Sequence, residues 1–137
     1  MENENPSIVS HVSIGTNDMP RAVAFYDAVL PVLGCKKLME FPFGAAYGKQ
    51  FPEFWVQLPI DGKPASVGNG THVCFIAQSK EAVHAFHEAA LAAGATDDGP
   101  PGPRPQYSPG YYGAFARDAD GHKVEAVYFD ASVGEHA

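Results

Sequence analysis

The chain has 137 residues, which is enough for one domain with a sizeable core, and its apolar fraction of 45% is ordinary for a globular protein. The formal net charge of −7 argues against binding to nucleic acid and to anionic membrane surfaces, because basic residues are few and scattered. No apolar run approaches the length that crosses a bilayer, so a small molecule is the expected partner.

The N-terminus and the cysteines indicate a cytoplasmic protein. The opening "MENENPS" is short, acidic and polar, which predicts a frayed tail and no signal peptide. Cys35 and Cys74 are far apart and form no Cys-x-x-Cys pattern, so free thiols in a reducing cytosol are expected.

An internal repeat organises the sequence. The segment "HVSIGTNDMPRAVAFYDAVL" begins at His11 and "HVCFIAQSKEAVHAFHEAAL" begins at His72, an offset of 61 residues (72 minus 11). Each copy starts with strand-like alternation, passes a polar break and continues with helical spacing. The repeat predicts a single domain over residues 1–137 made of two modules, at about 8–60 and 70–130.

The first helix is predicted over about residues 19–33. Asp18 lies at its N-cap, Pro20 in its first turn and Gly34 at its end, and Phe25, Val29 and Leu33 form its apolar stripe.

The second helix is predicted over about residues 80–93, with Ser79 as its cap and Gly94 at its end. Its apolar stripe is formed by Val83, Phe86, Ala90 and Ala93. His84 and His87 lie on this helix and are expected to be solvated.

Three strands are predicted after each helix. They lie at about 37–41, 45–49 and 53–58 in the first half, and near 105–108 (weak), 111–117 and 122–129 in the second. The Pro- and Gly-rich stretch 97–109 is expected to be an ordered loop. Each half therefore reads βαβββ, an α+β arrangement that leaves one sheet face open, so two halves must cooperate to build a concavity.

Four polar side chains are predicted on the open face. Strand alternation directs the apolar residues of four predicted strands toward the helices. In chain order the four sets are Val12 and Ile14; Phe54, Val56 and Leu58; Val73 and Phe75; and Val124, Ala126 and Tyr128. The opposite face then receives His11, Gln57, His72 and Glu125.

A metal ion explains these four residues together. Two imidazoles, a carboxylate and an amide oxygen suit a divalent first-row cation, which would also neutralise a carboxylate in the middle of a strand. The alternative is that both histidines are hydrogen-bonded interior residues, that Gln57 only lines a pocket, and that Glu125 pairs with Lys123 or an arginine. His122, at a turn, and His136, in the tail, are weaker candidates.

The segments "HVSIGTNDMPRAVAFYDAVL", "GTHVCFIA" and "RDADGHKVEAVYF" resemble the vicinal-oxygen-chelate superfamily of glyoxalase I, methylmalonyl-CoA epimerase, extradiol dioxygenases and resistance proteins. The resemblance covers roughly residues 8–130. It implies paired βαβββ modules in a cupped, incomplete barrel around one metal ion (Ni, Co, Zn, Mn or Fe), usually in a homodimer. His11, Gln57, His72 and Glu125 match the four metal positions.

The resemblance leaves three functions open. Epimerases of the superfamily have a His-Gln-His-Glu set, so Gln57 favours a glyoxalase I-like lyase or isomerase, with Glu125 as the base by analogy and Glu40 as a weaker separate base. Dioxygenases and fosfomycin-resistance enzymes resemble His-His-Glu sites, so an Fe(II) dioxygenase using His11, His72 and Glu125 is a second possibility. A non-catalytic binding protein of the bleomycin-resistance type is the third.

Several other residues are candidates for substrate contact. Trp55 lies two residues before Gln57 in the same predicted strand, so it shares its face and is expected to form the floor of the pocket. Arg104 offers a bidentate donor for an anionic group, against the alternative of a surface arginine. The amphipathic rings of Tyr107, Tyr111 and Tyr112 serve either as walls of the pocket or in packing. The extended "VLPVLGCKKL" after the first helix is expected to reshape one wall.

Overall fold

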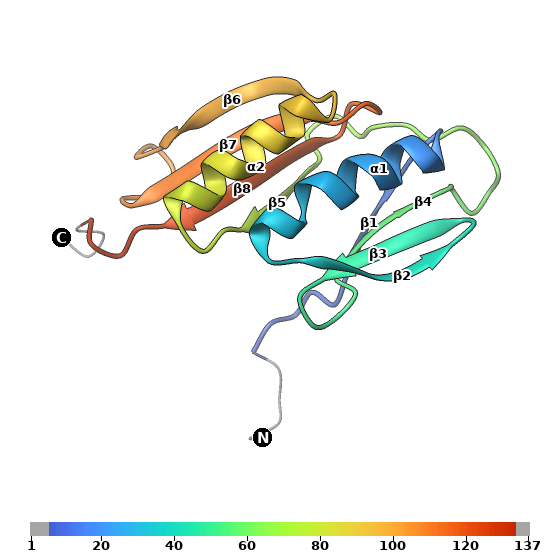
Figure 1. The fold of residues 1–137 in the computed structure, drawn as a ribbon, viewed down its shortest axis with the longest axis horizontal. Helices are drawn as coiled ribbons and strands as arrows, with labels where there is room; N and C mark the ends of the chain where they lie inside the picture. Colours follow the sequence, from blue (N-terminus) through green and yellow to red (C-terminus); the bar gives the residue numbers. More distant parts are fainter. Residues whose placement is uncertain (1–5, 134–137) are drawn as a thin grey trace.

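A computed structural model describes residues 6–133, so the first five residues and His136 lie outside the described part of the chain. Figure 1 shows the order of its elements. They are β1 (Val12–Gly15), α1 (Met19–Val29), a 3₁₀ turn (Pro31–Leu33), β2 (Lys36–Phe41), β3 (Gly44–Gly48), β4 (Phe54–Gln57), β5 (His72–Ile76), α2 (Lys80–Ala92), β6 (Thr96–Pro103), β7 (Tyr111–Arg117) and β8 (Lys123–Phe129).

The strands form two four-stranded sheets with matching topology. Their orders are β1-β4-β3-β2 and β5-β8-β7-β6. In each sheet the first strand pairs in parallel with the last strand of its half, and the remaining pairs are antiparallel. The expected α+β fold of two βαβββ modules is therefore confirmed, with sheets that do not close into a barrel.

Both helices begin where their caps predict. The Asp18 carboxylate accepts from the Arg21 amide, and the Ser79 hydroxyl accepts from the Ala82 amide. The first helix is shorter than predicted, because Pro31 cannot donate the next helical hydrogen bond. A 3₁₀ turn follows it, and Gly34 ends that turn with a φ of 83°.

A single hydrophobic core joins the two modules. The helices α1 and α2 pack against each other, and the rings of Phe54 (β4) and Phe75 (β5) meet edge to face at 5.1 Å. Three details correct the sequence prediction. Ala93 is exposed because the helix has already ended, Val12 is 37% exposed at the start of its strand, and His87 is buried with Nε2 2.9 Å from an oxygen of Asp97.

The second half contains a strand that the sequence did not predict. Residues 96–103 form β6, which overlaps the stretch 97–109 expected to be a loop, whereas the weak strand near 105–108 is absent from the described residues. Proline is tolerated in β6 because it is an edge strand with two register shifts, where a missing amide donor breaks little of the ladder.

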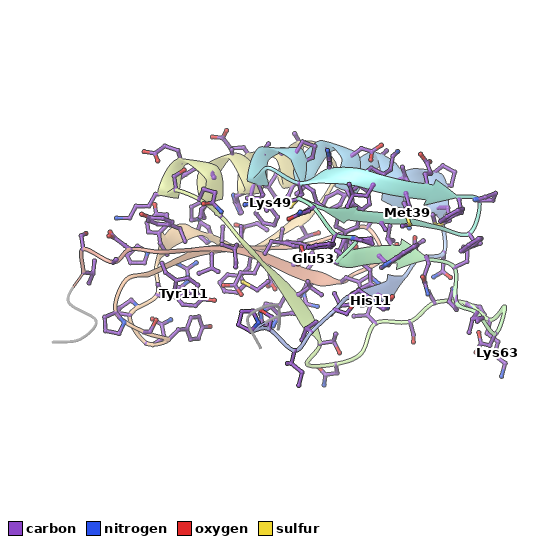
Figure 2. All side chains as sticks on the ribbon, turned by 90° about the horizontal axis from the view of Figure 1, so that it is seen from below. His11, Met39, Lys49, Glu53, Lys63 and Tyr111 are labelled. Atoms are coloured by element: carbon purple, nitrogen blue, oxygen red, sulfur yellow. The ribbon has the colours of Figure 1, made fainter. Side chains whose placement is uncertain are left out.

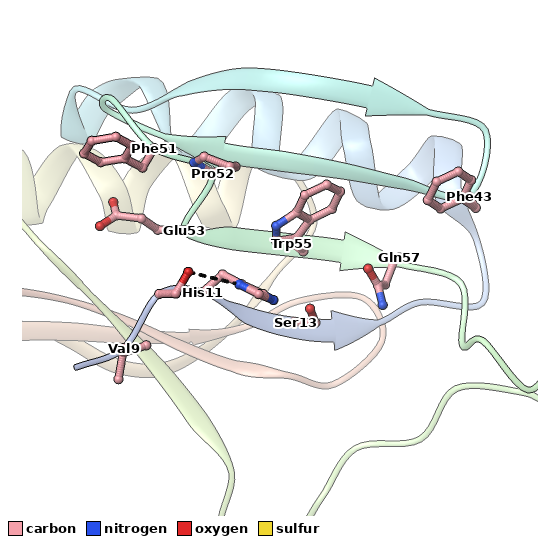
Figure 3. Close-up of a pocket in the computed structure, with 10 residues that line it drawn as sticks. Val9, His11, Ser13, Phe43, Phe51, Pro52, Glu53, Trp55 and Gln57 are labelled. Atoms are coloured by element: carbon pink, nitrogen blue, oxygen red, sulfur yellow. Dashed lines mark hydrogen bonds between the residues drawn. The ribbon is translucent and has the colours of Figure 1, made fainter. Parts of the chain in front are cut away.

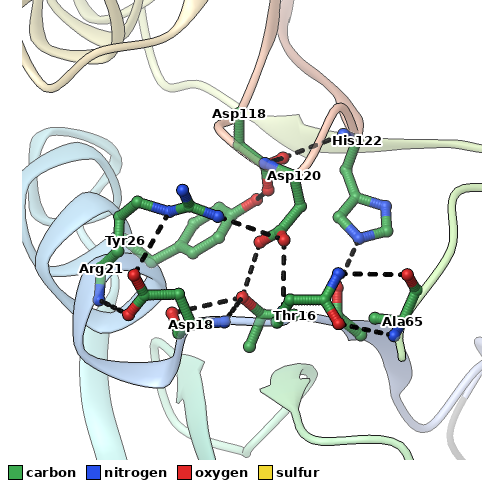
Figure 4. Close-up of polar contacts among 10 residues, drawn as sticks. Thr16, Asp18, Arg21, Tyr26, Ala65, Asp118, Asp120 and His122 are labelled. Atoms are coloured by element: carbon green, nitrogen blue, oxygen red, sulfur yellow. Dashed lines mark hydrogen bonds and ion pairs between the residues drawn. The ribbon is translucent and has the colours of Figure 1, made fainter. Parts of the chain in front are cut away.

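A polar network fastens the turn between β7 and β8 to the first module (Figure 4). The Tyr26 hydroxyl donates to Asp118 at 2.6 Å, and the Thr16 hydroxyl donates to Asp120 at 2.6 Å. Nε2 of His122 lies 2.6 Å from the Gly15 carbonyl oxygen. We call these three contacts the inter-module network. His122 is buried, and its contact with the Gly15 carbonyl gives its ring a polar partner within the protein.

Candidate metal and substrate site

The open face of each sheet carries the polar residues that alternation predicts. Phe54 and Val56 are buried in the core, whereas Trp55 and Gln57, which alternate with them along β4, line a cavity on the other side. In β8, Val124 and Ala126 belong to the core, whereas Glu125 points away from it. Figure 2 shows His11 and Tyr111 on the side of the sheets opposite the helices.

The first half-site is a cavity of about 660 Å³ on the sheet of the first module (Figure 3). Its lining includes His11, just before β1, Ser13 from β1, and Trp55 and Gln57 from β4, together with Phe43 and Glu53. Gly44, the Cα partner of Gln57 in β3, leaves room for the start of the Gln57 side chain, because a Cβ there would lie 3.0 Å from Gln57 Cβ. The cavity thus combines the polar side chains of His11, Ser13 and Gln57 with the aromatic rings of Phe43 and Trp55.

The second half-site is built around Glu125, in a strand paired on both sides. Its side chain is only 1% exposed. Nε2 of His72 lies 2.9 Å from Oε1, and the Tyr111 hydroxyl donates to Oε2. Within residues 6–133, Glu125 forms no ion pair with a lysine or arginine, and Lys123 lies instead near Asp98. The expected alternative partners of Glu125 are thus replaced by His72 and Tyr111.

Two groups beside Glu125 have raised pKa values. Burial raises the pKa of the Cys74 thiol to about 12, and the negative charge of Glu125, its Cα partner, adds to this effect. Burial also raises the pKa of Tyr111, and its hydrogen bond to Glu125 acts in the same direction. Both groups therefore stay protonated at neutral pH and act as donors.

The structure brings the four predicted ligands together as two pairs. His11 and Gln57 line the cavity of the first sheet, and His72 and Glu125 are adjacent on the second; the lining of that cavity includes neither His72 nor Glu125. Among residues 6–133, no three His, Cys, Asp or Glu side chains are grouped so as to hold a metal ion.

The remaining candidates lie at different places. Glu40 is about half exposed and pairs with Lys37 at 2.7 Å, a placement that gives no support to a second base. Arg104 donates to the carbonyls of Pro100 and Pro103 and lies over the Phe115 ring, 5.5 Å from its centroid. Within the described chain no carboxylate pairs with it.

The three candidate tyrosines lie in different surroundings. Tyr111 contacts Glu125, and Tyr107 is 59% exposed with its ring against that of Tyr111. Tyr112 packs against the core on the helix side, with its hydroxyl 2.7 Å from Nε2 of His84, so it faces away from Glu125.

Sequence reasoning missed part of the site. Ser13 shares the face of His11 at the spacing of two that alternation requires, so a signal for it was present. Phe41 and Phe43 are stacked at 5.2 Å, and Phe41 is parallel to Trp55 at 6.5 Å. This stack follows from the tight turn between β2 and β3, which a periodicity argument does not reveal.

Comparison with known proteins gives the family. The model of the Glyoxalase/Bleomycin resistance protein/Dioxygenase superfamily matches residues 8–126. The chain belongs to this superfamily. Among proteins with curated functional descriptions, none matches the sequence.

Solved structures agree with this superfamily assignment. A glyoxalase/bleomycin resistance protein from Albidiferax ferrireducens T118 is 39% identical, with a TM-score of 0.80 over 89% of this chain and 98% of that one. A glyoxalase-related enzyme from Fulvimarina pelagi is 19% identical, with a TM-score of 0.70 over 89% and 88% of the two chains. TioX from Micromonospora sp. ML1 is 22% identical, with a TM-score of 0.61 over 86% and 93%. The last two show the fold alone.

No helix within residues 6–133 is long and apolar enough to span a membrane.

Proposed function

We propose that this superfamily member is a metal-dependent lyase or isomerase of the glyoxalase I type, acting on a small carbonyl compound. His11, Gln57, His72 and Glu125 would hold one divalent cation, of Ni, Co, Zn, Mn or Fe. The observation that carries the proposal is the buried Glu125 carboxylate, which faces the His72 imidazole and has no lysine or arginine partner in the described chain.

The donor pair suits a cation in chemistry and in spacing. A buried carboxylate is costly unless a positive charge or several donors compensate it. Nε2 of His72 and Oε1 of Glu125 are 2.9 Å apart. Two adjacent ligands at right angles, each about 2.1 Å from an ion, would be separated by about 3.0 Å. The pair therefore fits two neighbouring positions of one coordination sphere.

We further propose that the site is completed between two copies of the chain. Each open sheet face carries half of the ligand set, and each is rich in exposed apolar side chains. These include Met39 at 41%, Phe41 at 42%, Ile76 at 64% and Phe129 at 55% exposed. Contact between the open face of one copy and that of another would cover these groups and bring a His11–Gln57 pair to a His72–Glu125 pair.

The chain's own groups supply the proton chemistry. A bound cation would polarise the substrate carbonyl, which makes the neighbouring C–H acidic. Glu125 would then take that proton on a carboxylate oxygen and return it to the adjacent carbon. The Trp55 ring would hold the substrate against the sheet, and Arg104, free of a carboxylate partner in the described chain, would bind an anionic substrate group.

A specific observation also favours non-catalytic binding. Phe41, Phe43 and Trp55 form a stack of nearly parallel rings beside the cavity, suited to a flat ligand. In that case the protein would bind such a compound without metal. A dioxygenase with His11, His72 and Glu125 as iron ligands remains the other enzyme class, distinguished by oxygen uptake with a catechol.

Metal content tests the leading proposal. Purified wild type, His72→Ala and Glu125→Gln proteins would be loaded with Ni, Co, Zn, Mn or Fe, desalted and measured by elemental analysis. His84→Ala is the matched control, because His84 is exposed on α2 and contacts Tyr112. We expect one ion per chain in wild type and control, and strong loss in the two site variants.

Equal and negligible metal in all four proteins would end both enzyme proposals. Where metal binds, deuterium exchange next to a substrate carbonyl, followed by NMR, separates isomerase chemistry from oxygen consumption.

A further inference from the structure

Glu125 is held by two different neighbours, one on each oxygen. Nε2 of His72, from β5, faces Oε1, and the Tyr111 hydroxyl, from β7, donates to Oε2. Because Glu125 lies in the strand between them, the carboxylate is fixed from both sides. The first neighbour is a proposed metal ligand, but Tyr111 has no function in the scheme above.

The Tyr111 ring is itself fixed. It lies edge to face against Phe129 at 5.5 Å and against Tyr107 at 5.1 Å. These contacts restrict the ring, so its hydroxyl is presented to Glu125 in one direction. Tyr107 offers a comparison within the same cluster, because it supports the ring and is 59% exposed, and no hydrogen bond joins it to Glu125 in the described chain.

A glycine leaves the space that this contact needs. A Cβ at Gly113, two residues after Tyr111 on the same strand, would lie 3.1 Å from Oε2 of Glu125. That separation is tighter than ordinary van der Waals contact, and the same Cβ would lie 3.3 Å from Cε1 of Tyr111, so alanine there would disturb the contact between the carboxylate and the tyrosine. Two separate features of β7 therefore act on the same oxygen.

We propose that Tyr111 is the positioning residue of the metal site: by anchoring Oε2 of Glu125 it leaves Oε1 as the single oxygen offered beside His72. This inference rests on the proposed function and adds to it. It assigns Tyr111, a candidate either for a wall of the substrate pocket or for packing, to the support of a ligand. Groups that orient a metal ligand in this way strongly affect affinity, because a free carboxylate must lose its rotational freedom on binding.

Cobalt(II) titration of the full-length protein tests the inference. Affinity would be measured by calorimetry, and the visible absorption of bound cobalt(II) would report its coordination. We expect Tyr111→Phe, which removes only the hydroxyl, to weaken binding roughly 10- to 100-fold and to alter the spectrum. Gly113→Ala should also weaken cobalt(II) binding and alter the spectrum, because it keeps the Tyr111 hydroxyl but adds a methyl group beside Oε2 of Glu125. Tyr107→Phe should match wild type in both measurements.

The outcomes separate this inference from the proposed function. If wild type binds cobalt(II) and Tyr111→Phe binds it with equal affinity and the same spectrum, the inference is overturned and the metal proposal stands. Equal weakening by Tyr107→Phe would also overturn it, because packing and not the hydroxyl would then be responsible. If wild type does not bind, the proposed function fails and this inference with it. Circular dichroism of each variant confirms that the fold is retained.

Discussion

At the scale of single residues, Glu125 controls the chemistry of its neighbours. Its buried charge faces a thiol, a phenol and an imidazole on adjacent strands. Burial, with the carboxylate acting in the same direction, raises the pKa values of the Cys74 thiol and the Tyr111 phenol. This effect is measurable without knowing the substrate.

The Cys74 thiol reports on that charge. Its pKa of about 12 predicts very slow alkylation of the metal-free protein by iodoacetamide at pH 8, because the thiolate is the reactive form and a free cysteine has a pKa of about 8.5. The residue as a whole is exposed, so the slow reaction would reflect the local environment of the thiol. Glu125→Gln should speed the reaction severalfold or more, since it removes the adjacent charge.

Cys35 is the internal control for this measurement. Burial is the main cause of its raised pKa, and Glu125 is not among the causes. Peptide mass spectrometry after timed alkylation would follow both thiols in one sample. A Cys74 rate that is unchanged by Glu125→Gln would contradict the effect of the carboxylate.

At the scale of elements, the inter-module network adds polar contacts to the hydrophobic core that joins the two modules. Asp118, in the turn between β7 and β8, accepts the Tyr26 hydroxyl and the amides of Asp120 and His122. Tyr26 is fully buried on α1. One carboxylate thus satisfies donors from both modules, and removing a donor leaves it partly unpaired.

Tyr26→Phe should lower the free energy of unfolding by about 1.5–3 kcal/mol, the range for a hydrogen bond to a charged group. Denaturant titration measures it. Tyr47→Phe is the matched control, because Tyr47 donates to Asp27, which is more exposed and lies in the same module. We expect a smaller loss there, and an equal loss would contradict a special contribution of the inter-module contact.

The pH dependence of this contact has a definite sign. Burial, followed by the charge of Asp118, raises the pKa of Tyr26 well above its ordinary value. A folded-state pKa above the unfolded one adds stability that is complete below the unfolded value, about 10, and is lost as the pH rises from there toward the folded value. Wild-type stability should therefore fall more steeply above pH 10 than that of Tyr26→Phe, and parallel curves would contradict this.

The elements also show which parts of the fold could be predicted from the sequence. Asp18 and Ser79 act through local hydrogen bonds, so both helix starts were predictable. The alternation around Gln57 and Glu125 assigned both to the open face, because a strand has a fixed period. The strand at 96–103 was missed, since its proline content is tolerated only at a sheet edge, and edges depend on tertiary structure.

At the scale of the whole molecule, the alternation of side chains along a strand predicts which sheet face carries each proposed metal-binding residue. It does not predict whether that face meets another part of the same chain or a second copy. His11 and Gln57 lie on one sheet and His72 and Glu125 on the other, and the first pair's cavity contains neither member of the second pair. Both open faces expose large apolar side chains. If the four residues bind one ion, as proposed, the copy of the chain that supplies each pair depends on assembly, which the local sequence does not encode.

Mixing two variants, each expected to bind little metal, tests that distribution. His11→Ala disables one half of the ligand set and Glu125→Gln the other, so each alone should bind little metal. If sites form between copies, a mixed dimer contains one site built from the two intact halves and one built from the two altered halves. About half of the dimers are mixed after free exchange, so about a quarter of the wild-type metal capacity should return.

Sites contained within one chain would each carry a mutation in this experiment, and no capacity would return. Elemental analysis of the mixture, after brief denaturation and joint refolding, provides the measurement, and sedimentation confirms the dimer. A mixture of His11→Ala with Gln57→Ala is the control, because both changes fall in the same half-site, so a mixed dimer gains no intact site. Recovery with the first mixture and not with the second would locate the metal between two open sheet faces.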